Sequence, residues 1–203
     1  MLAPKSLFCL AGNLKKRPNG PLIIDFGIDI MIGFCPLASG SKGNCIYLGT
    51  ERTKILIDCG ISGRQTIKRL TEIGVAIEEI DAVLVSHEHG DHITGLKVVA
   101  CRKGIPVLAN NETAKAIAGQ FKNCPQFKIF STGETFEFQD LRIHPFSIPH
   151  DCSDPVAFTI CYEDIKIGVC TDLGFATPLV VNKLKDCDYL YVESNHDPEL
   201  VFS

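Results

Sequence analysis

The chain has 203 residues, 45% of them hydrophobic and 22% charged, which is the composition of a globular domain with a substantial core. Its formal net charge is −4 at pH 7, so any contact with nucleic acid must depend on a local basic patch rather than on overall charge. No apolar run in the sequence is long enough to span a membrane, and we expect no membrane partner.

The ten cysteines form no C-x-x-C motif. Four of them lie in or beside apolar strand-like runs, where a free thiol packs as a small hydrophobic group: Cys45, Cys59, Cys161 and Cys170. A disulfide framework would call for a secreted protein, and the apolar stretch over residues 7–14 is short and interrupted for a secretion signal. We therefore predict a cytoplasmic protein with reduced cysteines.

Residues 1–30 show no clear hydrophobic period and contain a basic turn at residues 15–20. Met31 begins an apolar run that is typical of a first strand. We expect Met31 to be the true start and residues 1–30 to be an N-terminal extension, with one domain over residues 31–203. An ordered N-terminal addition is the alternative.

Short apolar runs bounded by turn residues predict strands after the first, over residues 45–49, 54–58, 81–85, 105–109, 128–130, 135–138, 141–148, 155–161, 165–170 and 188–192. Apolar residues at helical spacing and capping residues predict helices, over residues 63–73, 92–101, 111–121 and 177–184. Two pairs of strands read as hairpins, namely 128–130 with 135–138 and 155–161 with 165–170. This mixture of strands and helices predicts an α/β fold.

Residues 86–92 read Ser-His-Glu-His-Gly-Asp-His and follow the predicted buried strand 81–85. Imidazole and carboxylate groups together are the ligands that a borderline divalent cation prefers. His87 and His89 are two residues apart, so on extended backbone they point the same way and can bind one ion. Asp91 and His92 belong to the following turn and helix, and they suit a second ion. The spacing predicts a binuclear site, whereas a structural zinc site would use mostly cysteine.

A glycine-serine loop over residues 39–44 follows the first predicted strand. Its backbone amides, together with Ser41, Lys42 and Asn44, could bind a phosphate group. The same spacing is also common in a simple hairpin turn. Five of the six histidines follow predicted strands, which indicates a common site: His87, His89, His92, His150 and His196.

The motif at residues 86–92 resembles the signature of the metallo-β-lactamase-fold hydrolases. Three further segments match the YycJ/WalJ/VicX branch of that superfamily: residues 37–44, 171–174 and 193–197. The resemblance covers residues 31–203 and implies a four-layer αββα sandwich with a metal-dependent hydrolytic site. Family members continue with further strands and a last metal-binding histidine. We therefore expect this chain to be C-terminally truncated, with an incomplete second half.

The resemblance also implies roles for residues outside the motif. His150 matches a third histidine ligand, and Asp172 matches the aspartate that bridges two metal ions. Asp58 matches an aspartate that supports a ligand histidine, and Glu193 matches part of an acidic motif in nucleases of this fold. His196 is a candidate phosphate-binding residue or general acid, and Asp91 could also orient the attacking water.

The branch implies an exonuclease that acts on duplex DNA ends through two divalent ions, zinc or manganese. RNA is a second possible substrate. Two alternatives stay open, because one fold hosts many reactions. The first is a small-molecule hydrolase such as a thioesterase or lactonase, and the second is an inactive, truncated product. The sequence does not choose the native metal, the polarity of cleavage or the oligomeric state.

Overall fold

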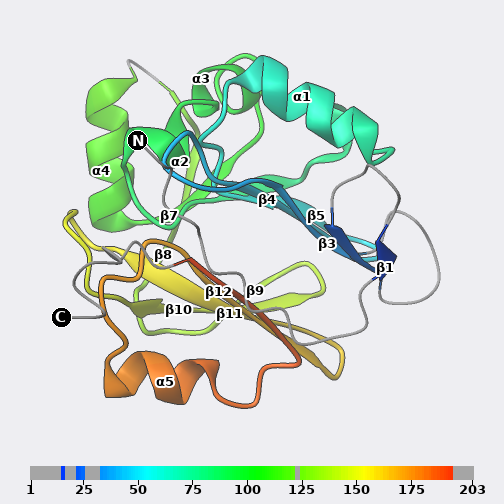
Figure 1. The fold of residues 1–203 in the computed structure, drawn as a ribbon. Coiled ribbons are helices and arrows are strands. Elements are labelled where there is room, and N and C mark those ends of the chain that lie inside the picture. Colours follow the sequence, from blue (N-terminus) through cyan, green and yellow to red (C-terminus); the bar gives the residue numbers. More distant parts are fainter. Residues whose placement is uncertain (1–14, 17–21, 26–32, 122–123, 194–203) are drawn as a thin grey trace, which may run out of the picture.

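The computed structural model describes residues 15–16, 22–25, 33–121 and 124–193. Two β-sheets stack face to face, with helices α1 to α4 covering the outer face of the first and α5 covering the outer face of the second (Figure 1). This arrangement confirms the predicted four-layer αββα sandwich.

Within the described ranges, the first sheet has eight strands that lie in chain order, which are β1 (Lys15–Lys16), β2 (Leu22–Asp25), β3 (Gly33–Ala38), β4 (Cys45–Gly49), β5 (Lys54–Ile57), β6 (Ala82–Leu84), β7 (Val107–Asn110) and β8 (Phe127–Phe130). Pairing is antiparallel from β1 to β5 and parallel from β5 to β8. The carboxyl ends of the four parallel strands therefore meet at one edge, where loops can carry polar side chains without disturbing the core.

In the part of the chain that the structure describes, the second sheet has five strands, which are β9 (Phe136–Phe138), β10 (Leu141–Ser147), β11 (Val156–Tyr162), β12 (Ile165–Cys170) and β13 (Tyr189–Val192). Their order is β13-β12-β11-β10-β9, and only the β12–β13 pair is parallel. The predicted hairpin of β11 and β12 is confirmed, with Tyr162 opposite Ile165 and Glu163 in a left-handed conformation in the turn.

The helices are α1 (Gly63–Glu72), η1 (Ile77–Glu79, a short 3-10 helix), α2 (Gly90–Ile93), α3 (Leu96–Val99), α4 (Asn111–Gln120) and α5 (Pro178–Leu184). Three of them begin with a side chain that accepts a hydrogen bond from a backbone N–H of the first turn: Ser62, Asn110 and Thr177. Such caps satisfy N–H groups that have no partner within the helix. The prediction that Asn110 or Asn111 caps the helix near residue 111 is confirmed for Asn110.

The alternating side chains of each strand fill two cores on opposite faces of the first sheet. Leu56 and Val83 pack towards α1 and α3, whereas Ile57 and Leu84 face the second sheet and meet Phe158 and other residues there. A third and smaller core lies beneath α5. The period of two in β-strands produces this division, and burial of these apolar groups is the main force that joins the layers.

The predicted hairpin of residues 128–130 and 135–138 is wrong. β8 pairs in parallel with β7 in the first sheet, with Val107 opposite Phe127, and β9 pairs with β10 in the second sheet. The segment between β8 and β9 therefore crosses from one sheet to the other. Nearness in sequence favoured a hairpin, but Phe130 of β8 instead stacks on Phe136 of β9 in the core between the two sheets, with their ring centroids 5.2 Å apart.

The predicted continuous helix over residues 92–101 is also wrong, because two short helices, α2 and α3, flank a turn at Thr94 and Gly95. The Gly95 N–H donates to the Cys59 carbonyl at 2.7 Å. A Cβ atom on Gly95 would lie 2.4 Å from Cys59 Sγ and 2.5 Å from the Ile61 carbonyl oxygen. This turn packs directly on the loop after β5, so the helix is interrupted there.

The prediction that all cysteines are reduced is wrong for one pair. Cys101 and Cys124 form a disulfide, with their Cα atoms 5.5 Å apart. Seven other cysteines in the described part of the chain are free: Cys35, Cys45, Cys59, Cys152, Cys161, Cys170 and Cys187. Among the described residues, none of the helices has the length and hydrophobicity needed to cross a membrane.

Candidate metal centre

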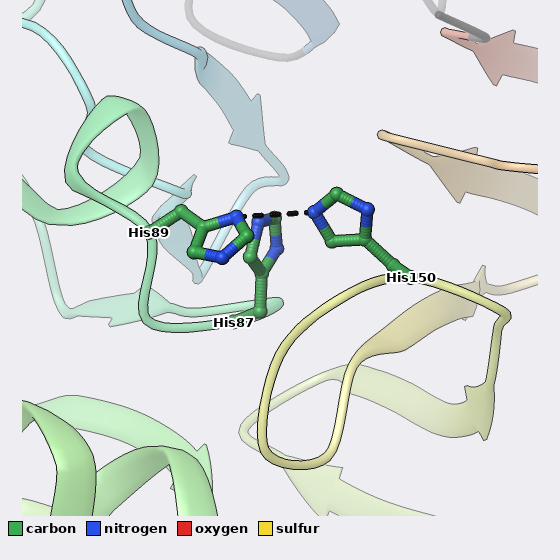
Figure 2. Close-up of side chains that lie close together, drawn as sticks. All are labelled: His87, His89 and His150. Atoms are coloured by element: carbon green, nitrogen blue, oxygen red, sulfur yellow. Dashed lines mark hydrogen bonds between the residues drawn. The ribbon is translucent and has the colours of Figure 1, made fainter.

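Three histidines converge where the carboxyl end of the first sheet meets the second sheet. His87 and His89 come from the loop after β6, and His150 comes from the segment after β10 (Figure 2). His150 Nε2 lies 3.1 Å from His89 Nδ1, and the three ring centroids are 4.7–4.9 Å apart. One ring nitrogen from each histidine lies within 4.8 Å of the others, so the three could hold one metal ion.

A second group shares His87 and adds His92, at the end of the motif, and Asp172, from the turn after β12. Asp172 Oδ2 lies 2.6 Å from His92 Nε2 and 3.6 Å from His87 Nε2. All three residues are buried. Asp91 lies beside this group, with its Oδ2 atom 3.8 Å from His92 Nε2. Asp172 thus belongs to the second group and also lies close to His87, which is a member of the first group, and its bridging role stays a prediction.

Asp58, at the end of β5, organises the back of the site. Its carboxylate accepts hydrogen bonds from the Ser86 N–H at 2.8 Å and from the Ser86 hydroxyl at 2.8–3.0 Å. The carboxylate also lies 2.8 Å from His92 Nδ1, which donates a hydrogen bond to it, while His92 Nε2 faces Asp172. Asp58 therefore lies where the sequence predicted support for a ligand histidine.

The same network sets the tautomer of His87. The Ser86 hydroxyl has one proton, which it donates to Asp58, so His87 Nδ1 at 3.0 Å must donate to the hydroxyl oxygen. His87 Nε2 is then left as an acceptor. It is buried and has no hydrogen-bond partner among the described residues. A buried acceptor of this kind, aimed at a carboxylate and two histidines, suits a metal ion, and the site fits a divalent cation.

Two of these aspartates adopt backbone conformations that are uncommon outside glycine. Asp58 has φ 58° and Asp172 has φ 51°, both in the left-handed region. Aspartate tolerates this region better than most residues, at a cost on the order of 1 kcal/mol. Both lie directly after strands, where the left-handed turn directs the carboxylate towards the histidines. Glu193 is hydrogen-bonded on both sides of the turn that carries Asp172. Its N–H donates to the Cys170 carbonyl, and its carbonyl accepts from the Leu173 N–H.

Burial and neighbouring charges give the histidines different proton affinities. Burial, together with the nearby His92, lowers the pKa of His87 to about 3. Burial also lowers the pKa of His150. For His92, burial acts in the same direction but the Asp58 and Asp172 carboxylates outweigh it and raise its pKa to about 10. His87 and His150 are therefore neutral at pH 7 and ready to bind a cation, whereas a cation at His92 would replace a proton.

The pKa values of the two acidic residues Asp172 and Glu193 are shifted in opposite directions. Burial raises the pKa of Asp172, but the hydrogen bond and the charge of His92 outweigh it and hold that pKa below its usual range. For Glu193, burial and the nearby Asp172 carboxylate raise the pKa. Asp172 is therefore an anion at neutral pH, as a metal ligand must be.

The loop predicted to bind phosphate has two environments. Ser41 and Lys42 are exposed at the tip of the turn, whereas Asn44 is buried. Asn44 Nδ2 lies 3.0 Å from His92 Nε2, and its Oδ1 accepts the Gly40 N–H. The Asn44 side chain therefore supports the loop and the metal centre, and a phosphate role for the three residues stays a prediction. His196 lies outside the described residues, so its predicted role also stays a prediction.

Three contacts at this site were missed by the sequence analysis: the hydroxyl of Ser86 on Asp58, the amide of Asn44 on His92, and the carboxylate of Glu88 on Ser153. Ser86 and Glu88 stand inside the motif, and their place beside the ligand histidines was the available signal. Asn44 is 48 positions from His92, and no local pattern connects the two.

Replacing Asp58 with asparagine should lower the pKa of His92 in the metal-free protein, because one of the two carboxylates that raise it is lost. Because the pKa of His92 is raised in the folded protein, its protonation stabilises the fold. This contribution to the unfolding free energy is complete below the unfolded-state pKa of about 6.5, and it is lost as the pH rises towards 10. In Asp58→Asn the fall in unfolding free energy should therefore stop at a pH below 10, and its total size should be smaller. NMR titration of the His92 ring and urea unfolding would measure the two effects.

Asp188→Asn is the matched control, because Asp188 also accepts a backbone N–H, from Lys166, but lies at an exposed position away from the histidines. It should leave the His92 titration unchanged. An unaltered His92 pKa in Asp58→Asn would contradict the role assigned to Asp58.

Comparison with known proteins places this geometry in a family. Residues 53–200 match the family model described as "Beta-lactamase superfamily domain". The exodeoxyribonuclease YycJ of Bacillus anthracis is 36% identical over 170 residues, covering 83% of this chain and 64% of the relative. The exodeoxyribonuclease WalJ of Streptococcus pneumoniae is 35% identical over 171 residues, covering 82% of this chain and 64% of the relative.

The chain thus spans just under two thirds of the length of these two relatives. Among solved structures, the subclass B3 metallo-β-lactamase MEM-A1 from a soil metagenome is similar with a TM-score of 0.61 and 20% identity, covering 86% of this chain and 79% of that enzyme. This likeness shows a shared fold. The matched model covers most of the chain, and the histidine and aspartate cluster lies at the expected sheet edge, so the chain belongs to the β-lactamase superfamily and adopts the metallo-β-lactamase fold.

Proposed function

We propose that this protein is a metal-dependent phosphodiesterase that degrades DNA from duplex ends. The observation that carries the proposal is the pair of ligand groups that share His87, one with His89 and His150 and the other with His92 and Asp172. The similarity to two proteins named exodeoxyribonucleases supports DNA as the substrate class. A cytoplasmic location is part of the proposal, since DNA would be encountered there.

The residues present would hold two divalent ions, zinc or manganese. His87, His89 and His150 would bind the first. His92 and Asp91 would bind the second, with Asp172 between the two. When bound, such ions lower the pKa of a water molecule towards neutrality and neutralise charge on phosphoryl oxygens.

The chain's own groups prepare the site for in-line attack on phosphorus. Ser86 and Asp58 fix the tautomers of His87 and His92, so both Nε2 atoms face the reaction centre. Asp91 is about one third exposed, at 31% of its side-chain surface, and can accept a hydrogen bond that orients the attacking water. His196 is proposed to bind phosphate or to protonate the leaving oxygen.

Degradation of linear duplex DNA by the purified chain, supplied with zinc or manganese, would test this function. We expect linear duplex to be shortened and closed circular duplex to be left intact, because only the former has ends. A metal chelator should abolish the reaction, and Asp172→Asn should reduce its rate by on the order of 100-fold or more, through loss of the anionic ligand.

Other outcomes would redirect the assignment. Equal cleavage of circular and linear DNA would contradict action at ends, and preferential cleavage of RNA would replace the substrate. Hydrolysis of a thioester or lactone without any phosphodiester cleavage would favour the small-molecule hydrolase. A chain that binds metal but hydrolyses none of these substrates would indicate an inactive product.

A further inference from the structure

Among the described residues, the hydrogen bonds that join the His150 loop to the second sheet lie at the base of the loop. It leaves the sheet after β10 and returns at β11, and the Ile148 N–H donates to the Pro155 carbonyl across the base at 3.1 Å. The Gly174 N–H donates to the Pro149 carbonyl at 3.3 Å and connects the loop to the turn that carries Asp172. Beyond this base the loop is polar, and Asp151 and Ser153 are exposed.

Glu88 reaches this loop from the first sheet. It stands between His87 and His89, and its Oε1 atom accepts hydrogen bonds from the Ser153 N–H at 2.8 Å and from the Ser153 hydroxyl at 2.6 Å. Both distances are those of strong, charge-assisted bonds to a carboxylate. The residue that separates two ligand histidines in sequence thus binds the loop that supplies the third.

Asp154 makes a second connection to the first sheet. Its carbonyl accepts a hydrogen bond from Asn110 Nδ2 at 2.7 Å, and its carboxylate accepts one from the Thr132 hydroxyl at 2.8 Å. Asn110 is buried and is already fixed as the cap of α4. The Val156 N–H also donates to the Ser86 carbonyl at 3.2 Å. These contacts hold the C-terminal side of the loop, and among the contacts with the first sheet the one made by Glu88 lies nearest to His150 in sequence.

We propose that Glu88 is a positioning residue that docks the His150 loop on the first sheet and so completes the three-histidine ligand group. This inference rests on the proposed function, because it assigns Glu88 a role towards the metal. Without the Ser153 contacts, His150 would sample positions away from His87 and His89, and the free energy of ordering the loop would reduce metal affinity. Ligand supports of this kind change metal affinity by about 10- to 100-fold.

The test measures zinc affinity by competition with a colorimetric chelator, and amide hydrogen exchange of Ser153 in the metal-free protein. Glu88→Ala should weaken zinc binding about 10- to 100-fold and speed Ser153 exchange. Glu88→Gln keeps an acceptor oxygen, so its zinc affinity and its Ser153 exchange rate should lie between those of Glu88→Ala and the wild-type protein. Ser153→Ala keeps the backbone hydrogen bond and should change the zinc affinity less than Glu88→Ala does. Glu112→Gln is the control, because Glu112 is an exposed glutamate on α4 paired with Lys115.

The outcomes separate this role from the proposed function. Unchanged zinc affinity in Glu88→Ala and Glu88→Gln would overturn the positioning role, even if the wild-type protein degrades DNA. Weaker affinity with unchanged Ser153 exchange would overturn it too, because the effect would then come from the charge of Glu88. A wild-type protein that binds no zinc would overturn the metal-dependent function together with this role, while the exchange data would still report whether Glu88 orders the loop.

Discussion

Replacing Gly60 with alanine should prevent the chain from folding stably. A Cβ atom on Gly60 would lie 1.5 Å from the Asp91 carbonyl oxygen and 2.7 Å from the Asn44 backbone nitrogen. The obstacle is backbone, which cannot rotate away as a side chain can. The Asn44 N–H donates to that same Asp91 carbonyl, and the Gly60 N–H donates to the Asn44 carbonyl, both at 2.7 Å. Relieving the clash would therefore separate three segments that form the floor of the metal centre.

We expect Gly60→Ala to lose about 4 kcal/mol or more of unfolding free energy, which is a large part of the 5–15 kcal/mol typical of a domain. Urea unfolding of the metal-free protein would measure the loss. Gly119→Ala is the matched control, because a Cβ atom on Gly119 meets no atom within 4 Å and the residue lies in α4. That substitution should be neutral or should stabilise by up to about 1 kcal/mol. Similar stabilities for the two variants would contradict the close approach at Gly60.

Replacing His87 with alanine should remove the zinc ion proposed to bind to His87, His89 and His150, because His87 is the buried member of that group. The ion proposed at His92, Asp91 and Asp172 should keep its ligands. His89→Ala should weaken the first position less, because His89 is partly exposed. Calorimetric titration with zinc would separate the two positions. We expect a loss of affinity of on the order of 1,000-fold or more at the first position in His87→Ala, since a buried ligand is lost from it.

His144→Ala is the control for this comparison. His144 lies on β10 and contacts the Thr135 hydroxyl through Nδ1 at 2.9 Å, away from both ligand groups. Zinc binding in this variant should match the wild-type protein. An equal loss of affinity at both zinc positions in His87→Ala would contradict the assignment of His87 to the first ion.

The strand before the motif and the common direction of His87 and His89 could be predicted because both depend on local sequence. Val83 and Leu84 form a short and fully buried strand, and the period of two in extended backbone brings His87 and His89 to one side. The approach of His150 and Asp172 was predicted from resemblance alone. These residues are more than 60 positions away from His87, and no local periodicity encodes such a contact.

The errors arose where tertiary packing overrides local preference. β8 and β9 are near neighbours in sequence but belong to different sheets, because pairing partners are selected by burial across the whole domain. The helix predicted over residues 92–101 is broken at Gly95 by its contact with Cys59, which lies in a separate part of the sequence. The disulfide of Cys101 and Cys124 spans 23 positions and follows from the same long-range geometry.

The residues proposed to hold the two ions differ in their access to solvent, and this difference implies an order of metal loading for the proposed binuclear site. His89 and His150 are partly exposed, whereas His92 and Asp172 are buried. The ion proposed at His87, His89 and His150 would therefore have two partly exposed ligands and should exchange faster than the ion proposed at His92, Asp91 and Asp172. Gradual chelation should pass through a species that keeps the second ion, and reloading should complete the first position last. The first ion would then be the one that exchanges with the metal pool of its surroundings.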